Sequence, residues 1–202
     1  MVGAPVTFWC EFSSPYGYVG AEQIGGIAAQ AGRPLVWRPF LLGGVFKVTG
    51  ARPLIEMAEP KGSYFRRDFL RTAGFYGLSI TMPQRFPFAA IAATRAAYWV
   101  EATAPERMGE VVLALYRACY RDGRAIGEAA TVLDVVAEAG FERAAVEAGI
   151  AEAAIKQRAI AAGEEALAAG VFGSPFVTVD GERFWGSDRL DQVRKWLVEG
   201  PW

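Results

Sequence analysis

Histidine is absent from this sequence, and its absence excludes several kinds of active site. A Ser-His-Asp or Cys-His catalytic group cannot be assembled from the chain, and neither can a metal site with histidine ligands. Any nucleophile must therefore be activated by another route, such as the N-terminus of a helix or a cofactor that brings its own reactive group.

Cysteine is scarce as well, because Cys10 and Cys119 are the only two. They lie far apart and form neither a CxxC pair nor a zinc-binding pattern, which argues against thiol–disulfide exchange. Each falls in a predicted strand or helix, so we expect both to pack as small apolar side chains. This usage fits a reducing compartment, and we expect the protein to be cytoplasmic.

Long apolar runs and net charge are also lacking. No run approaches the roughly 18 to 20 residues that span a bilayer, and the segment from Met1 to Thr7 has neither the basic leader nor the apolar core of a secretory signal. The 21 basic and 22 acidic residues produce no overall field that attracts anionic polymers or surfaces. We therefore expect neither a nucleic acid nor a membrane as a partner.

The start of the chain predicts a β-α-β unit. The apolar segment Pro5 to Phe12 is rich in β-forming residues and predicts a buried strand. A helix is predicted from Tyr16 to Ala31, closed by a glycine, and a second strand from Leu35 to Phe40. Glycines and prolines then indicate a loop with a short helix from Leu41 to Pro60.

The middle of the chain is rich in alanine and has helical periodicity. Helices are predicted over Tyr64 to Tyr76, Phe88 to Ala102, Pro105 to Arg121, Ala130 to Ala139, Glu142 to Ala148 and Ala151 to Ala169. Strand patterns return from Phe176 to Val179 and from Arg183 to Trp185, around an Asp-Gly turn, and a helix over Arg189 to Glu199 follows.

This order predicts an α/β protein with a thioredoxin-like fold and a large all-helical insertion between its βαβ and ββα halves. The thioredoxin-like domain is predicted to be discontinuous, with residues 1–43 and 170–202, and residues 44–169 form the helical insertion domain.

Ser14 is the first candidate for chemistry, because it directly precedes a proline at the predicted start of the first helix. Its hydroxyl can cap the helix amides, which is a purely structural role. Alternatively, the helix end can stabilise an anion by roughly 0.3 to 2 kcal/mol, and the Ser14 hydroxyl can donate to a thiolate bound there. Ser14 itself is a poor nucleophile without a base.

Two further segments are candidates. Ser174-Pro175 precedes a strand and is either an ordinary turn or a cis bond that exposes the Ser174 amide and carbonyl for pairing with a peptide. Ser187 and Asp188 either cap the last helix or bind the carboxylate and ammonium of an amino acid headgroup. Lys47, in the predicted loop after the second strand, is either solvated or contacts an anion.

Considered together, these segments resemble the 2-hydroxychromene-2-carboxylate isomerases and the kappa-class glutathione transferases, within the DsbA-like group of the thioredoxin superfamily. The resembling stretches are FWCEFSSPYGYVG (8–20), PFLLGGVFKVTGARP (39–53), FYGLSITMP (75–83) and GVFGSPFVTVDGERFWGSDRL (170–190). Oxidoreductases of the group carry a CPxC motif where this chain has Ser14-Pro15-Tyr16-Gly17.

The resemblance implies glutathione as the cofactor, with Ser14 donating to its sulfur and favouring the thiolate. It also implies that Pro175 is cis, with Ser174 pairing to the cysteinyl backbone of glutathione. Ser187 and Asp188 are implied to hold the γ-glutamyl end, with Arg189 in the same run. Lys47 is implied to contact the tripeptide, and a homodimer is expected.

Four features depart from the pattern of these families, and one of them is that Phe88-Ala89-Ala90 lacks the asparagine usual after the Phe-Pro pair. Glu11 replaces an aspartate that often precedes the Ser-Pro motif, and Gly17 stands where a serine is common. Ala51 occupies a position where we expect an asparagine that helps to bind glutathione.

The implied activity is the glutathione-dependent isomerisation of 2-hydroxychromene-2-carboxylate to trans-o-hydroxybenzylidenepyruvate, a step of aromatic hydrocarbon catabolism. The expected substrate pocket lies between Ser14 and the helical insertion, with Phe46, Phe86 and Phe88 as walls. Two alternatives remain open. One is a kappa-type transferase that conjugates glutathione to electrophiles, and the other is a non-catalytic binding module that has kept the fold, which Ala51 favours.

Overall fold

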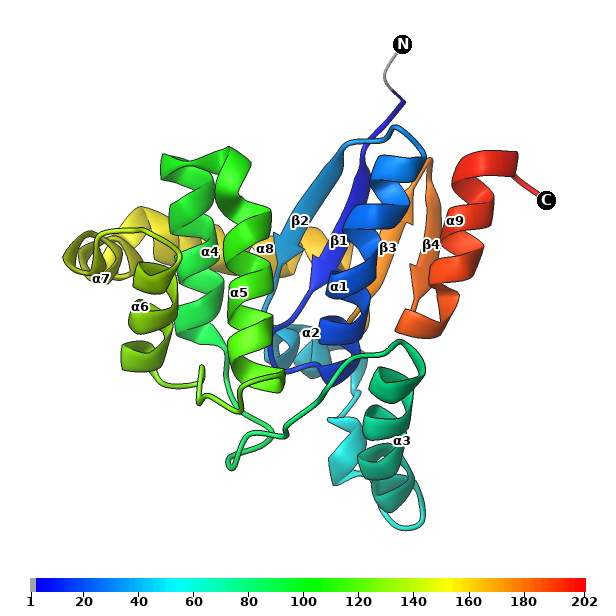
Figure 1. Ribbon diagram of the computed structural model, residues 1–202, viewed down its shortest axis with the longest axis horizontal. Helices are drawn as coiled ribbons and strands as arrows, with labels where there is room; N and C mark the ends of the chain where they lie inside the picture. Colours follow the sequence, from blue (N-terminus) through cyan, green and yellow to red (C-terminus); the bar gives the residue numbers. More distant parts are fainter. Residues whose placement is uncertain (1–2) are drawn as a thin grey trace.

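A four-stranded mixed sheet forms the centre of the molecule (Figure 1). The computed structural model describes residues 3–202. Met1 and Val2, which the predicted thioredoxin-like domain includes, lie outside the described residues. The strands are β1 (Val6–Cys10), β2 (Leu35–Pro39), β3 (Phe176–Val179) and β4 (Glu182–Trp185). Their order is β2-β1-β3-β4, with β1 parallel to β2 and antiparallel to β3. The βαβ and ββα halves therefore join where β1 pairs with β3.

Helices account for most of the remaining chain, as the periodicity predicts. They are α1 (Pro15–Gln30), α2 (Leu42–Thr49), α3 (Lys61–Phe75), α4 (Ile91–Thr103), α5 (Met108–Tyr120), α6 (Ala129–Glu138), α7 (Arg143–Ala151), α8 (Ala153–Ala168) and α9 (Leu190–Glu199). Short 3₁₀ turns occur at Leu54–Glu56, Pro105–Arg107 and Ser187–Arg189. The predicted thioredoxin-like fold with a mostly helical insertion is confirmed.

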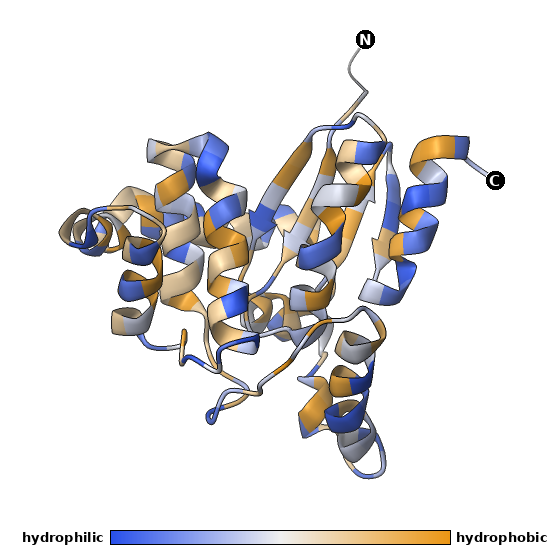
Figure 2. Cartoon of the chain, in the orientation of Figure 1, coloured by the Kyte–Doolittle hydropathy of each residue, from blue (hydrophilic) through white to orange (hydrophobic). Residues whose placement is uncertain are grey.

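The two faces of the sheet contribute to two apolar clusters. Because side chains alternate along a strand, Phe8 and Cys10 of β1 join the larger cluster with α1, α4 and α5, whereas Trp9 joins a smaller one. That smaller cluster holds Val45 of α2 and Ala166 of α8. Figure 2 shows the apolar residues concentrated on the strands between these layers. Both faces of the sheet are thus packed against helices. This packing holds the ends of the strands, where the candidate site lies, in place.

The helical elements differ in where they lie. In Figure 1, α1 and α9 lie along the sheet, α4 to α7 gather at one side, and α3 forms a separate lobe below the start of α1. Helix α1 contacts α3, α5 and α9. No helix within residues 3–202 is long and apolar enough to cross a membrane.

Two predictions for single segments need correction. The segment from Leu41 to Pro60 contains the eight-residue helix α2, so Lys47 lies on a helix and not in a loop. This helix forms despite Gly43 and Gly44 because Val45 packs into the smaller apolar cluster. At the other end, neither Ser187 nor Asp188 caps the last helix, since both lie in a 3₁₀ turn and α9 begins at Leu190.

Candidate active site

Ser14 caps α1 with a hydroxyl that is engaged on two sides. Its Oγ accepts the N–H of Gly17 at 3.0 Å and donates to the carbonyl of Ser174 at 2.8 Å. Pro15 has no N–H, and among the described residues no hydrogen bond uses the amide of Tyr16. The structural role that the sequence predicts for Ser14 is therefore present, and one free amide remains beside it at the positive end of the helix.

The Ser174-Pro175 bond is cis, as the resemblance implies. Ser174 is held from two directions, because its carbonyl accepts from Ser14 and its Oγ accepts the backbone N–H of Glu11 at 3.0 Å. The carbonyl of Pro175 in turn accepts the N–H of Gly186 at 3.0 Å. These bonds connect three segments that are far apart in the sequence, so the candidate residues Ser14, Ser174 and Pro175 form one cluster.

The Ser187–Arg189 turn adjoins this cluster. It contacts α1, and Ser187 is buried whereas Asp188 is exposed. The charge of Asp188 is among the causes that raise the pKa of Tyr16, after burial and the neighbouring Asp68, so Asp188 lies close to the first turn of α1. Asp188 pairs with Arg189 at 2.9 Å across exposed side chains. The turn therefore presents one negative and one positive group beside Ser14.

Lys47 has no hydrogen bond or ion pair with this cluster within residues 3–202. It is exposed on α2, whose contacts run to α8. Ala51, where an asparagine is expected, is exposed just beyond the end of the same helix.

Glu11 is a buried carboxyl three residues before Ser14, with 3% of its surface exposed. Its Oε2 accepts the Ser13 N–H at 3.0 Å and also the Ser13 hydroxyl. Burial raises the pKa of Glu11 to about 7, although the two bonds from Ser13 act in the opposite direction. Sequence reasoning recorded Glu11 only as a departure from aspartate. The signal available in the sequence was an acidic residue within the otherwise apolar segment Pro5 to Phe12.

Tyr116 of α5 also reaches the cluster. Its ring is fully buried, and its hydroxyl donates to the carbonyl of Glu11 at 2.8 Å. A Cβ added to Gly17 would lie 2.6 Å from that hydroxyl oxygen and 3.1 Å from the Oγ of Ser174. The structure thus explains why glycine occupies a position where a serine is common in the related families.

Aromatic rings extend from the first turn of α1 toward the insertion. The ring centroids of Tyr16 and Phe69 are 4.7 Å apart, those of Phe69 and Phe86 are 6.5 Å apart, and those of Phe86 and Phe88 are 6.4 Å apart. The Tyr16 hydroxyl also donates to Asp68 of α3. Phe86 and Phe88 therefore belong to the aromatic series that begins beside Ser14.

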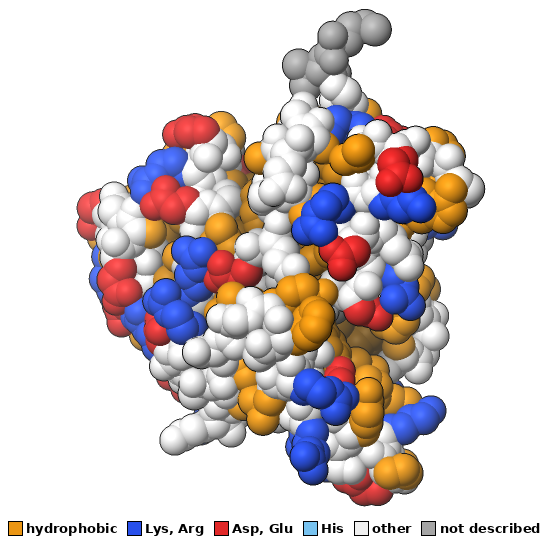
Figure 3. All heavy atoms as spheres, turned by 45° about the vertical axis from the view of Figure 1, so that its right-hand side comes forward, with side chains coloured by type: hydrophobic (Ala, Val, Ile, Leu, Met, Phe, Trp, Pro, Cys, Tyr) orange, Lys and Arg blue, Asp and Glu red, His pale blue; other side chains and the backbone are white. Residues whose placement is uncertain are grey.

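The surface of the molecule is hollowed beside the lobe formed by α3 (Figure 3). Figure 3 shows a recess where the lobe formed by α3 meets the rest of the molecule, with hydrophobic side chains in its walls. Phe46, the third expected wall, lies on α2 and forms no aromatic pair within the described residues. The sequence did not indicate the contribution of Tyr16 and Phe69.

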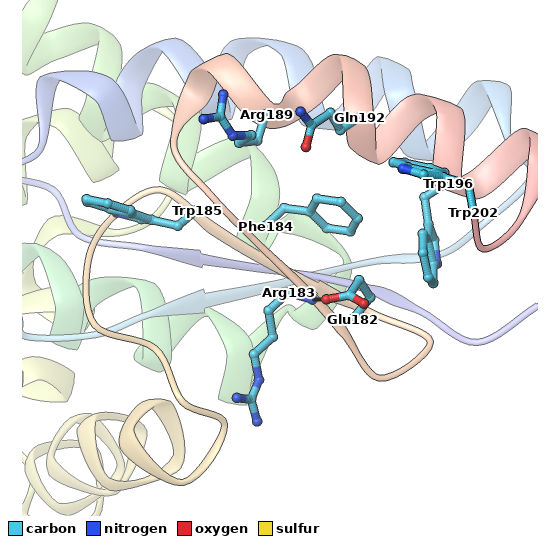
Figure 4. Close-up of a pocket in the computed structure, with 8 residues that line it drawn as sticks. All are labelled: Glu182, Arg183, Phe184, Trp185, Arg189, Gln192, Trp196 and Trp202. Carbon is cyan, nitrogen blue, oxygen red and sulfur yellow. Dashed lines mark hydrogen bonds between the residues drawn. The ribbon is translucent and has the colours of Figure 1, made fainter.

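A second groove lies elsewhere, between β4 and α9 (Figure 4). It has a volume of about 450 Å³ and is open to solvent. In Figure 4, Arg189 projects from the turn that precedes α9 and Gln192 projects from α9, both above Phe184, and Trp196 and Trp202 lie at the far end. Arg189 thus borders this groove while it pairs with Asp188. A smaller cavity of about 290 Å³ lies between α5 and α6.

The fold and the cluster define a protein of thioredoxin type in which serine stands at the start of the first helix. A family model of the DSBA-like thioredoxin domain matches residues 5–198. The chain belongs to this family.

Two curated relatives align with nearly the whole chain. Glutathione S-transferase kappa 2 of Caenorhabditis elegans is 26% identical over 214 residues, which cover 96% of this chain and 92% of the relative. A 2-hydroxychromene-2-carboxylate isomerase of Sphingobium xenophagum is 26% identical over 212 residues, which cover 96% of this chain and 98% of the relative. The resemblance to these two families is therefore confirmed, and both relatives are named as enzymes.

Solved structures agree on the fold. A 2-hydroxychromene-2-carboxylate isomerase superposes with a TM-score of 0.84 at 23% identity and covers 94% of this chain and 92% of its own. The cytosolic disulfide reductase DsbM of Pseudomonas aeruginosa, solved with GSH, gives a TM-score of 0.64 at 18% identity, with 97% and 93% covered.

Proposed function

We propose that this protein is a glutathione-dependent isomerase that converts 2-hydroxychromene-2-carboxylate to trans-o-hydroxybenzylidenepyruvate, a step of aromatic hydrocarbon catabolism. The observation that carries the proposal is the cluster in which Ser14, at the N-terminus of α1, meets Ser174 beside the cis Pro175. The proposal is also supported by the two curated relatives, one a glutathione S-transferase and the other a 2-hydroxychromene-2-carboxylate isomerase, which both align with nearly the whole chain. We also propose that the protein acts in the cytoplasm and as a homodimer.

The polar groups of the cluster fit glutathione by their chemistry. The tripeptide has a thiol, a peptide backbone, two carboxylates and one ammonium group. The amide of Tyr16 and the Ser14 hydroxyl are donors for the sulfur, and Ser174 offers backbone groups for the cysteinyl unit. Ser187, Asp188 and Arg189 are the groups for the γ-glutamyl end, because the turn carries both charges. Lys47 is proposed as a more distant contact.

Glutathione, when bound, supplies a thiolate that adds to the conjugated ring and leaves again after ring opening and bond rotation. The protein stabilises the sulfur anion with the dipole of α1 and with the hydroxyl of Ser14. For the hydroxyl to donate to sulfur, its proton must turn away from the Ser174 carbonyl, which is a rotation about one bond. The aromatic series of Tyr16, Phe69, Phe86 and Phe88, which begins in the first turn of α1, is proposed to orient a flat aromatic substrate.

The test mixes the protein, glutathione and the chromene substrate and follows the ultraviolet change of the isomerisation. We expect turnover that requires glutathione and falls about 10- to 100-fold in Ser14→Ala, since one donor to a developing anion is removed. The matched control is Ser63→Ala, a surface serine at the start of α3. No glutathione-dependent turnover, or an unchanged rate in Ser14→Ala, would contradict the proposal.

The second candidate is a kappa-type transferase that conjugates glutathione to electrophiles, which the relative from Caenorhabditis elegans favours. The same thiolate site serves this reaction, so an assay with a chromogenic aryl halide separates the two. Ala51, which stands where an asparagine is expected, favours a third possibility, a binding module without catalysis. Calorimetry distinguishes the binding module from the two enzymes, because both enzymes must bind glutathione. Absence of glutathione binding at millimolar concentration would contradict both enzymatic candidates.

A further inference from the structure

Glu11 has a position that a structural role alone does not require. A buried carboxylate is costly unless a cation or several hydrogen bonds compensate it. Both bonds to the Glu11 carboxylate come from Ser13, and no ion pair within residues 3–202 involves it. Its backbone N–H donates to Ser174 and its carbonyl accepts from Tyr116, so the residue belongs to the cluster.

The titratable groups that face Glu11 all remain neutral near pH 7. They are Cys10 of β1 and the residues Tyr116, Cys119 and Tyr120 of α5. Burial is the main cause that raises the pKa of each, and it places that of Cys119 at about 12. No lysine or arginine is among the groups that act on Glu11. Among these groups, Glu11 is the one whose pKa, raised by burial to about 7, lies near neutral pH.

Ser13 hydrogen-bonds Glu11 and directly precedes Ser14, the first residue of the proposed thiol site. It is half-buried, and its hydroxyl donates to the Glu11 carboxylate. A hydroxyl can donate one proton while its oxygen accepts another. Ser13 thus provides a one-residue bridge between the N-terminus of α1 and the buried carboxyl.

We propose that Glu11 accepts the proton of the glutathione thiol through Ser13 when the thiolate forms. This inference rests on the proposed function. The S–H proton moves to the Ser13 oxygen, the Ser13 proton moves to the Glu11 carboxylate, and the products are a thiolate and a neutral carboxylic acid. The two negative charges therefore never coexist a few residues apart, and the net charge of the site does not change. Glu11 does not touch glutathione in this scheme. It acts through Ser13 and is therefore a positioning residue and not a catalytic one.

Calorimetric counting of protons tests this transfer. Glutathione is titrated into the protein in buffers of different ionisation enthalpy, at a pH between the values of about 7 for Glu11 and about 8.5 for a free thiol. The variants are Glu11→Gln, which cannot accept the proton, and Glu11→Asp, which can. Glu164→Gln, at an exposed position of α8, is the matched control.

The thiolate is a negative charge near Glu11 and raises the pKa of that carboxyl above the working pH, so Glu11 keeps the proton it receives. We therefore expect wild type, Glu11→Asp and Glu164→Gln to release almost no proton on binding, and Glu11→Gln to release about one per glutathione. Equal release by wild type and Glu11→Gln would overturn the role of Glu11 and leave the proposed function standing. If Glu11→Gln does not fold, release of about one proton by wild type alone overturns it. Absence of binding heat in wild type would overturn the proposed function, and this inference with it.

Discussion

At the scale of single residues, Ser14 contributes to stability and to the proposed chemistry through the same oxygen atom. Its Oγ accepts from Gly17 and donates to Ser174. We predict that Ser14→Ala lowers the free energy of unfolding by about 1 kcal/mol, the usual cost of removing a serine cap. Denaturant unfolding measures this, with Ser63→Ala as the comparison. A loss of stability no larger than that of the control would contradict the capping role.

Glu11 predicts a pH dependence of stability with a definite sign. Its pKa is raised on folding from 4.5 to about 7. The folded state therefore binds the proton more tightly than the unfolded state, and this contribution is complete below pH 4.5 and is lost as the pH rises through about 7. The loss is on the order of 3 kcal/mol, from about 1.4 kcal/mol per pKa unit.

The measurement is the difference in unfolding free energy between Glu11→Gln and wild type. We expect wild type to lose stability relative to the variant between pH 4.5 and 7, with a plateau above that window. A difference that stays constant from pH 4 to 8 would show that Glu11 does not change its pKa on folding.

At the scale of elements, the start of α1 is packed so closely that only glycine fits at its third residue. A Cβ on Gly17 would lie 2.6 Å from the Tyr116 hydroxyl, whereas a Cβ on Gly25 or Gly26 of the same helix meets nothing within 4 Å. We predict that Gly17→Ala destabilises the protein by about 1 to 3 kcal/mol. Gly25→Ala is expected to stabilise it by about 0.5 to 1 kcal/mol, since alanine is the better helix former.

Thermal unfolding of the two alanine variants compares these effects on one helix. The glutathione affinity should also fall in Gly17→Ala and stay unchanged in Gly25→Ala, because the clash also involves Ser174. Stabilisation of both variants would contradict the close approach of Tyr116 to α1.

The order and type of the elements were largely predictable from the sequence. Alternation and the Asp-Gly turn predicted β3 and β4, and alanine-rich periodicity predicted α4 to α8, with boundaries within a few residues. The short helix predicted within Leu41 to Pro60 had no bounds, and Lys47 was wrongly placed in a loop. Glycines and prolines dominate that segment, and only the packing of Val45 reveals why a helix forms there. Local propensity cannot indicate a partner that lies far away in the chain.

The candidate site was predictable only in part for the same reason. The sequence indicates Ser14, Ser174-Pro175 and the Ser187–Arg189 segment separately, and the structure brings them together at one end of the sheet. The bonds from Tyr116 to Glu11 and from Tyr16 to Asp68 span 105 and 52 residues. No local pattern specifies contacts at such separations, so Tyr116, Tyr16 and Asp68 were missed.

At the scale of the whole molecule, ligand binding is expected to stabilise the fold because the proposed site joins both halves of the chain. Ser14 belongs to the βαβ half, and Ser174 and the Ser187–Arg189 turn belong to the ββα half. Glutathione at about 100 times its Kd should add about 2.7 kcal/mol to the free energy of unfolding. Thermal unfolding with glutathione and with its S-methyl derivative measures this, and the thiol should give the larger shift.

The most direct measurement is the thiol pKa of glutathione bound to wild type and to Ser14→Ala, followed by the ultraviolet absorbance of the thiolate. The helix dipole and the Ser14 hydroxyl should lower this pKa by about one unit or more from the free value of about 8.5. In Ser14→Ala it should return toward that value. A bound thiol with the same pKa in both proteins would contradict the role of Ser14 as the group that activates a borrowed thiol.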